Sequence, residues 1–365
     1  MTIGIDGNEA NVDEQVGVSV YTQNLLYFFQ KKASSKLEFR IFLRKKPKQF
    51  LPKETHYFRY HVVPGRRLWS QIFLPLSLSK HPDLDVFFSP AHYAPRFCPV
   101  PLVVTIHDLA YFYFSREFLK KDLHKLKNWT RYSVKKAARI IAVSQQTKKD
   151  IITYYDIPEG NIDVIYNGYE KTLNAKQRTS PNFKFNMLNY ILYVGTLQPR
   201  KNVQTLIRAF SKFVVHNAQF KLILVGKKGW LYDEIFSLVK DLELEDKIIF
   251  TGYISDDELQ NLYKNAWCFV MPSLYEGFGI PVLEAMSNKC PVIASSSSSV
   301  PEIGGKACLY FDPENEDQLL KLLNSLQSNS KLRANLIRKG LERVKFFSWE
   351  KCAEKTLTVL KNTVG

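Results

Sequence analysis

Hydrophobic residues fall into short runs that alternate along the chain with longer segments of helical spacing. In the first half, each run ends in small or polar residues, as expected of buried parallel strands that lead into loops. The runs are TIGIDG (2–7), EFRIFLR (38–44), DVFFSP (85–90), PLVVTIHD (101–108), RIIAVS (139–144) and IDVIYNG (162–168). Helical spacing is found in 21–32, in the proline-containing 68–80 and in 118–138. The first half therefore predicts a parallel sheet with helices on both faces.

A second series of the same kind follows a polar, proline-containing stretch at 173–186. Its apolar runs are 191–197, 221–226, 247–253, 268–273, 291–296 and 308–312, and its helical segments are 203–216, 232–242, 255–266 and 280–288. The fold class is therefore α/β, with two doubly wound Rossmann-like domains. Ligands of such sheets bind outside the carboxyl ends of the strands, so a cleft between the two domains is the expected site.

Composition narrows the class of protein. The chain has 365 residues, of which 45% are hydrophobic, enough for two ordinary cores. It has no run of 18 apolar residues and no leader-like start, so neither a membrane span nor a signal peptide is expected. The five cysteines form no CxxC pair, which predicts reduced core thiols in a cytoplasmic protein and no zinc site.

The positive charge is uneven. Residues 1–180 carry 28 Lys and Arg against 16 Asp and Glu, whereas the remaining residues carry 23 against 19. The first half should therefore attract an anionic partner, such as a membrane surface, a nucleic acid or a phosphorylated small molecule. A solvated basic face without a partner is the structural alternative.

Two glutamates flank a glycine-rich turn in LYEGFGIPVLEAM (274–286). Pro281 suits a first helical position and predicts a helix over 281–288. The preceding glycines let the backbone approach a ligand, and a helix N-terminus suits an anion. Glu276 on the loop and Glu284 in the first turn could accept hydrogen bonds from sugar hydroxyls. Alternatively, Glu284 only complements the helix dipole and Glu276 is a surface acid.

Three other positions are candidates for chemistry. Arg200 and Lys201 lie between an expected strand and the helix at 203–216, where two cations could clamp a diphosphate. His107 ends an apolar strand and could be a general base or a donor to a sugar hydroxyl. Gly17 is expected just before a helix. A basic loop and a packed histidine are the structural alternatives.

Taken in order, these motifs resemble the retaining glycosyltransferases of family 4, which have the GT-B architecture. The resemblance rests on Arg200-Lys201, GYISDDELQNLY, Glu276-x7-Glu284 in EGFGIPVLEAM and PVIASSSSSVPEIGG. In the first half, IGIDGNEA, GVSVYTQNLL, LWSQIFLPL, FFSPAHYAP and VVTIHDLAYF look like the mannosyltransferase-type branch. The resemblance implies an acceptor-binding domain at 1–175 and a donor-binding domain at 186–345. A terminal helix at 346–365, anchored by Trp349, would pack on the first domain.

The resemblance also implies roles for individual residues. Arg200 and Lys201 would hold the donor diphosphate, Glu276 the donor sugar, and Glu284 the ribose. His107 would lie near the transferred sugar. Further donor contacts would come from Gly17, Gly252, Tyr253, Ile254, Phe278, Gly279 and Ile280. One departure is that the family often has Gly-Ile-Gly-Arg-Tyr where this chain has GVSVY, which weakens the assignment of Gly17.

The activity implied is transfer of a hexose from a nucleotide sugar, with retention and without a metal. The mannosyltransferase-like first half favours GDP-mannose as the donor, with UDP- or ADP-glucose as the alternatives. Asp83 and Asp85 form a DxD by letter but precede a strand, so they are expected in a loop. The acceptor would be a glycan or lipid-linked glycan, and the basic segment 116–139 would suit an anionic inner membrane face.

Other classes of protein fit these motifs less well. A nucleotide-sugar epimerase would need a different pattern of carboxylates and histidines, and a glycogen-type phosphorylase would need a pyridoxal lysine motif. A nucleic-acid-binding protein would interleave basic residues with exposed aromatics, but here most aromatics lie in apolar runs. A non-catalytic relative need not retain both cations and both glutamates.

Overall fold

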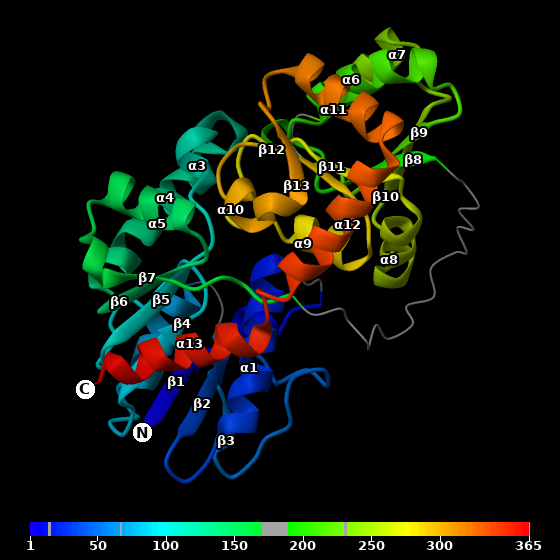
Figure 1. Ribbon diagram of the computed structural model, residues 1–365. Coiled ribbons are helices and arrows are strands. Elements are labelled where there is room, and N and C mark those ends of the chain that lie inside the picture. Colours follow the sequence, from blue (N-terminus) through cyan, green and yellow to red (C-terminus); the bar gives the residue numbers. More distant parts are fainter. Residues whose placement is uncertain (14–15, 66–67, 170–188, 230–231, 365) are drawn as a thin grey trace. The chain divides into compact units, whose positions relative to one another are not determined.

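The structure, a computed structural model, describes residues 1–13, 16–65, 68–169, 189–229 and 232–364 (Figure 1). The chain divides into two compact units, one of Met1–Gly168 with Phe347–Gly365 and one of Tyr169–Phe346. The polar stretch at 173–186, expected between the domains, lies outside the described residues. Both units have the α/β class predicted from the sequence.

The first unit is built on a seven-stranded sheet in the order β3-β2-β1-β4-β5-β6-β7, with every pairing parallel. The strands are β1 (Thr2–Asp6), β2 (Glu38–Leu43), β3 (Phe58–Val62), β4 (Val86–Ser89), β5 (Leu102–Ile106), β6 (Arg139–Ala142) and β7 (Ile162–Val164). All six predicted strands are confirmed. Strand β3 was not predicted, because it lies at the sheet edge and its sequence, FRYHV, is only partly buried.

Helices cover both faces of this sheet. They are α1 (Gly17–Lys32), α2 (Leu74–Leu78), α3 (Ala110–Tyr113), α4 (Lys120–Lys136), α5 (Gln145–Tyr155) and α13 (Trp349–Asn362). Neighbouring residues of β4 show the two faces. Val86 packs in one core with α1 and α13, and Phe87 packs in the other with α2, α4 and α5. The proline-containing segment predicted as helix is a π-helical turn, Trp69–Phe73, followed by α2.

The terminal helix is shorter than the segment 346–365 that was expected to form it. It begins at Trp349, because the Ser348 side chain caps it by accepting a hydrogen bond of 3.1 Å from the Lys351 amide. Trp349 is buried against Tyr21 of α1, with ring centroids 6.1 Å apart. The last helix therefore completes the core of the first unit.

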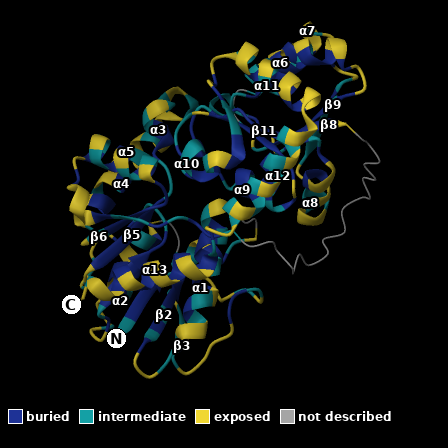
Figure 2. Cartoon of the chain, viewed as in Figure 1, coloured by how far each residue is buried: buried dark blue, intermediate teal, exposed yellow. Residues whose placement is uncertain are grey.

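The second unit repeats this arrangement with six strands in the order β10-β9-β8-β11-β12-β13. The strands are β8 (Tyr190–Val194), β9 (Lys221–Val225), β10 (Ile248–Gly252), β11 (Cys268–Met271), β12 (Val292–Ser295) and β13 (Cys308–Phe311). All are parallel and all were predicted. Figure 2 shows a central strand such as β11 as buried, with exposed residues on the helices, whereas the edge strand β10 is only partly buried.

The helices of the second unit are α6 (Val203–His216), α7 (Asp233–Asp241), α8 (Asp256–Asn265), α9 (Ile280–Ser287), α10 (Val300–Gly304), α11 (Glu316–Ser328) and α12 (Ser330–Val344). The first four were predicted to within a residue or two. Helix α8 begins where Ser255 and Glu258 form a capping box. Strand β8 pairs with both β9 and β11, so the loops that follow β8 and β11 meet at one edge of the sheet.

Candidate active site

The candidate site of the second unit lies where the strand order reverses. The loop after β8 contains the short turn Pro199–Lys201, and the loop after β11 runs to α9. Because β8 and β11 are neighbours, the carboxyl ends of both strands open at the same point of the sheet. A hydrogen bond of 2.9 Å from the Leu274 amide to the Arg200 carbonyl joins the two loops.

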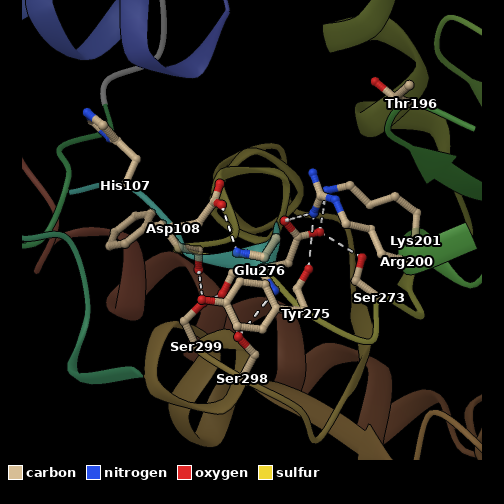
Figure 3. A network of polar contacts seen from close by, with 12 residues as sticks. His107, Asp108, Thr196, Arg200, Lys201, Ser273, Tyr275, Glu276, Ser298 and Ser299 are labelled. Atoms are coloured by element: carbon tan, nitrogen blue, oxygen red, sulfur yellow. Dashed lines mark hydrogen bonds and ion pairs between the residues drawn. The ribbon is translucent and has the colours of Figure 1, made fainter. Parts of the chain in front are cut away.

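Glu276 is the centre of a polar network at this point (Figure 3). Its Oε1 lies 2.5 Å from Lys201 Nζ, and its Oε2 lies 3.8 Å from an Arg200 guanidinium nitrogen. Ser273 Oγ also donates to Oε1 over 2.7 Å. Burial raises the pKa of Glu276, but Lys201 and Arg200 outweigh it and leave the pKa below its usual value. Glu276 is therefore a carboxylate held by two cations, and the cluster has a net charge of +1.

The backbone beside Glu276 is fixed by two serines. Ser299 Oγ donates to the Glu276 carbonyl over 2.8 Å and contacts the Phe278 carbonyl at 3.0 Å. Ser298 Oγ lies 2.5 Å from the Glu276 carbonyl and 3.2 Å from its amide nitrogen (Figure 3). The motif 291–305 was recognised in the sequence, but these contacts were not. They hold the glycine-rich loop in one conformation.

Arg200 is held on two sides. One guanidinium nitrogen donates to the Tyr275 carbonyl over 3.2 Å. With the Gln198 amide turned so that its oxygen faces Arg200, this oxygen accepts from two further guanidinium nitrogens at 2.8 and 3.0 Å. Such fixed, planar donors suit recognition of a phosphate. Gln198 was not identified from the sequence.

Helix α9 starts one residue earlier than predicted, at Ile280, with Pro281 in its first turn. Gly279 precedes it with φ of 100°, a conformation that favours glycine. Phe278 is buried below this turn. The early start places Glu284 in the second turn of the helix rather than the first.

Glu284 is held by a tyrosine hydroxyl and not by an ion pair with the cations of the cluster. The Tyr263 hydroxyl donates to its Oε2 over 2.9 Å. Burial raises the pKa of Glu284 to about 6, and Tyr263 lowers it in part. A half-buried carboxylate with one oxygen held in this way suits a neutral ligand that donates hydroxyls.

We expect Glu284→Gln to stabilise the ligand-free protein at about pH 7.5. Because burial raises the folded-state pKa from 4.5 to about 6, ionisation above that range costs folding free energy. An amide keeps the acceptor for Tyr263 and removes the charge, a gain of about 1–2 kcal/mol, or a few degrees in Tm. The gain should be full above pH 6 and vanish toward pH 4.5. The Tm of variant and wild type should be measured across this pH range. A Tm difference that does not change with pH would contradict the prediction.

Three further predicted residues end β10 and follow it. Gly252 closes the strand, and its carbonyl accepts a hydrogen bond of 3.0 Å from the Gly226 amide after β9. The Tyr253 side chain is 67% exposed, whereas Ile254 is buried. Lys227 lies over the Tyr253 ring, 5.3 Å from its centroid. These residues therefore sit at the same sheet edge as the Glu276 network, two strands away.

The two predicted site residues of the first unit lie on different elements. Gly17 is the exposed first residue of α1, not the residue before it. Apart from its chain neighbours and its own helix, no atom of the described residues lies within 4 Å of the position a Cβ would take. His107 follows β5, where burial lowers its pKa to about 4. Its Nε2 lies 2.8 Å from the Pro90 carbonyl, so Nε2 carries the proton and Nδ1 is the acceptor. At neutral pH the imidazole is uncharged.

Other expectations concern groups away from the network. Asp83 and Asp85 lie before β4, where Asp83 pairs with Arg40 and Asp85 accepts a hydrogen bond of 2.6 Å from the Thr2 amide. The cysteines are free thiols. Within the described ranges, no group of three or more His, Cys, Asp and Glu side chains is arranged to hold a metal ion. In that part of the chain, no helix is long and apolar enough to cross a membrane.

Comparison with known proteins identifies the family. Residues 17–172 match the family model described as Glycosyltransferase Family 4, and residues 176–343 match that of Glycosyl transferases group 1. An O-antigen chain mannosyltransferase B of Escherichia coli is 32% identical over 348 residues, which cover 90% of this chain and 84% of that protein. The chain belongs to glycosyltransferase family 4. The resemblance inferred from the motifs is thereby confirmed.

Solved structures confirm the architecture of this glycosyltransferase. Sucrose-phosphate synthase from Thermosynechococcus elongatus superposes with a TM-score of 0.74 at 19% identity, over 99% of this chain and 98% of that one. Anabaena HepE in complex with UDP-glucose superposes with a TM-score of 0.72 at 18% identity, over 99% of each chain. At such identities the likeness concerns the fold alone.

Proposed function

We propose that the enzyme transfers a hexose from a nucleotide sugar, held in the second unit, to a glycan or lipid-linked glycan. The observation that carries this proposal is the Arg200–Lys201–Glu276 cluster at the carboxyl ends of β8 and β11. Its excess positive charge suits a diphosphate, and its carboxylate suits the hydroxyls of the attached sugar. Binding of UDP-glucose by HepE, a protein of the same fold, supports a nucleotide-sugar donor.

Each predicted site residue of the second unit has a role in the proposed donor site. Arg200 and Lys201 bind the diphosphate and stabilise the charge that grows on it as it departs. Glu276 accepts hydrogen bonds from the donor sugar, and Glu284 from the ribose. Gly252, Tyr253 and Ile254 border the base, while the backbone of 278–280 borders the sugar and phosphates.

The donor sugar we propose is mannose, carried by GDP. The E. coli relative is named a mannosyltransferase, and it matches this chain over most of its length. UDP- and ADP-glucose are the competing donors. We propose that no metal is needed, because two protein cations already face the diphosphate position.

The proposed reaction retains the anomeric configuration. The acceptor hydroxyl oxygen attacks the anomeric carbon from the face of the departing diphosphate. The bond from that carbon to the diphosphate oxygen breaks, and the diphosphate takes the hydroxyl proton. The neutral His107 could orient a sugar hydroxyl through Nδ1, but at its lowered pKa it is a weak base. A glycosyl-enzyme adduct trapped during turnover would contradict this mechanism.

Nucleotide selection tests the proposed function. We expect GDP and GDP-mannose to raise the Tm of the enzyme in the presence of EDTA, with smaller shifts for UDP, ADP and their sugar conjugates. Glu284→Ala should abolish the shift, because it removes the ribose contact. Absence of a shift with every nucleotide, in a folded protein, would rule out the proposed donor site.

We also propose that the enzyme works at the cytoplasmic face of a membrane. Helix α4 exposes a row of basic side chains, among them Lys120, Lys121, Lys125, Arg131, Lys135 and Lys136. Arg139, in contrast, is neutralised by Asp163 at 2.7 Å. Anionic vesicles should therefore co-sediment the enzyme at low salt and release it as ionic strength rises. No binding even at low salt would count against the proposal.

A further inference from the structure

The first unit contains a pocket of about 610 Å³ that does not include any of the proposed donor-binding residues. It lies outside the carboxyl ends of β1, β2 and β4, and α4 contributes one wall. Strand β1 lies between β2 and β4, which the chain reaches on opposite sides, so the pocket occupies the switch point of this sheet. Its lining residues all belong to the Met1–Gly168 part of the unit.

Acidic residues form one wall of the pocket. Asp6, at the end of β1, accepts hydrogen bonds from the Asn8 amide at 3.1 Å and the Asn8 side chain at 2.9 Å, both through Oδ1. Its Oδ2 accepts none from the described part of the chain. Burial raises the pKa of Asp6 to about 6. Glu9 lines the same wall, and its pKa is also raised by burial. This wall can accept hydrogen bonds from hydroxyl groups.

Basic residues after β2 form a second wall. Arg44 donates from Nε to the Gly65 carbonyl over 2.8 Å, which leaves its terminal nitrogens for other partners. The exposed Lys45 ammonium makes no hydrogen bond or ion pair with the described residues. Lys48 is paired with Asp13. This wall offers a guanidinium and an ammonium to an anion.

The basic wall is tied to the acidic one by two asparagines. Asn8 accepts a hydrogen bond of 2.7 Å from the Arg44 amide. The Asn11 side chain donates to the Lys45 carbonyl at 3.2 Å and accepts from the Lys48 amide at 3.0 Å. Both walls are therefore fixed relative to each other before any ligand binds, which lowers the entropy cost of binding.

Aromatic rings complete the pocket. Trp129 of α4 and Tyr93 after β4 meet edge to face, with centroids 5.4 Å apart. Lys125 lies over both rings, 4.6 Å from the Trp129 centroid and 5.4 Å from that of Tyr93. Trp69 closes the base and donates its indole N–H to the Val63 carbonyl over 2.7 Å. An apolar wall beside fixed polar groups is typical of small-molecule sites.

From these three walls, we infer that the pocket binds the sugar phosphate portion of the acceptor. The sugar ring packs against Trp129, its hydroxyls donate to Asp6 and Glu9, and the phosphate meets Arg44 and Lys45. The inference rests on the proposed function, in that it specifies the chemical class of the acceptor. A neutral glycan would leave the basic wall unused, and a bare phosphate would leave the acidic wall facing an anion.

A soluble sugar phosphate and a lipid-linked one share this chemistry. The segment that begins at the pocket wall favours the second source, because it exposes apolar side chains. Leu68, which lines the pocket, is 50% exposed, and Ile72 and Leu76, which follow it along the chain, are 47% and 59% exposed. Leu68 also has φ of 62°, unusual for its residue type, at the start of the π-helical turn. A lipid chain leaving the pocket here would cover these side chains.

Calorimetry on the full chain at pH 8, where Asp6 is ionised, tests the inference with mannose 1-phosphate as the probe. Mannose 1-phosphate should bind more tightly than mannose or inorganic phosphate, and Asp6→Asn and Lys45→Ala should each weaken it about tenfold or more. Lys36→Ala, just before the opposite end of β2, is the control and should leave binding unchanged. No binding below about 10 mM, equal binding of inorganic phosphate, or unaltered affinity in both variants would overturn the inference.

Two further measurements distinguish failure of the acceptor pocket from failure of the donor site, and a lipid-linked acceptor from a soluble one. Asp6→Asn and Lys45→Ala should keep the nucleotide-induced Tm shift, and Glu284→Ala should keep sugar phosphate binding, so failure of one proposal does not hide the other. A farnesyl-diphosphate-linked hexose in detergent identifies the source. If it binds about tenfold more tightly than mannose 1-phosphate and Leu76→Ser removes this gain, the pocket takes a lipid-linked acceptor. Equal affinity assigns it a soluble one.

Discussion

Lys201→Ala should lower kcat by about 10²–10³-fold, measured as nucleotide released from the donor that gives the largest thermal shift. A preorganised cation aimed at developing charge is worth this much when water is excluded. The ammonium is already in place in the free enzyme, 2.5 Å from Glu276 and 15% exposed. The diphosphate of the donor would meet a group that needs no reorganisation.

The substitution also acts on its neighbour. Without Lys201, the carboxylate of Glu276 keeps Arg200 at 3.8 Å and the Ser273 hydroxyl as its partners. Burial raises the pKa of Glu276, and only Arg200 and Ser273 then remain to lower it. The pKa should therefore rise toward its usual value. A carboxyl with its usual pKa of 4.5 is ionised at neutral pH, so the loss in kcat should not be recovered by raising the pH further.

The matched control is Lys212→Ala, in the next helix. Lys212 is bonded to Glu316 and Asp317 at 2.7 Å on the surface, so its removal changes the charge of the unit equally without touching the network. This control should keep wild-type kcat. If Lys201→Ala retained more than about a tenth of the wild-type rate, Lys201 would not stabilise the leaving group.

The two sheets were predictable because most strands are buried on both faces. Strands such as β5 and β11 then consist of consecutive apolar residues, which stand out between helical segments. The edge strand β3 lacked this signal, since Arg59 and Val62 are exposed. The π-helical turn at Trp69–Phe73 was out of reach for another reason, because apolar spacing does not distinguish it from an α-helix.

The site was predictable as far as its residues come from strand ends. Lys201 and Glu276 are 75 positions apart, yet they meet because β8 and β11 are adjacent and parallel. Their pairing was not foreseen, since the cations were assigned to phosphate and the acid to a sugar. Ser299 and Tyr263 lie in motifs that the sequence analysis recognised, but their contacts with this loop and with Glu284 were not foreseen either. Their contacts depend on how β12 and α8 pack against the loop, which no local pattern records.

The pocket of the first unit shows the same limit more strongly. Asp6, Arg44 and Trp129 come from three elements spread over 124 positions, and each alone has an ordinary structural interpretation. Sequence patterns placed positive charge in this half of the chain. Only the order of the strands in the sheet brings a carboxylate, a guanidinium and an aromatic ring to one cavity.

Gly168→Ala should strongly destabilise the first unit, by about 3–5 kcal/mol. A Cβ at this position would lie 2.2 Å from the Trp349 amide nitrogen and 2.4 Å from its Cα. These are backbone atoms at the start of α13, and they cannot rotate away as a side chain could. The helix must shift, and with it Trp349, Cys352 and the other residues that α13 adds to the core.

The expected result is a fall in the Tm of the first unit by about 6–20 °C, measured by circular dichroism and tryptophan fluorescence. Gly160→Ala is the matched control, because in the described part of the chain, its two neighbours aside, no atom lies within 4 Å of the Cβ it would add. Since both glycines belong to the first unit, Gly168→Ala should still bind nucleotide below its Tm, through the second unit. A Tm within about 1 °C of that of Gly160→Ala would show that α13 can shift without loss of the core, and that the packing of Trp349 does not hold the C-terminal helix in place.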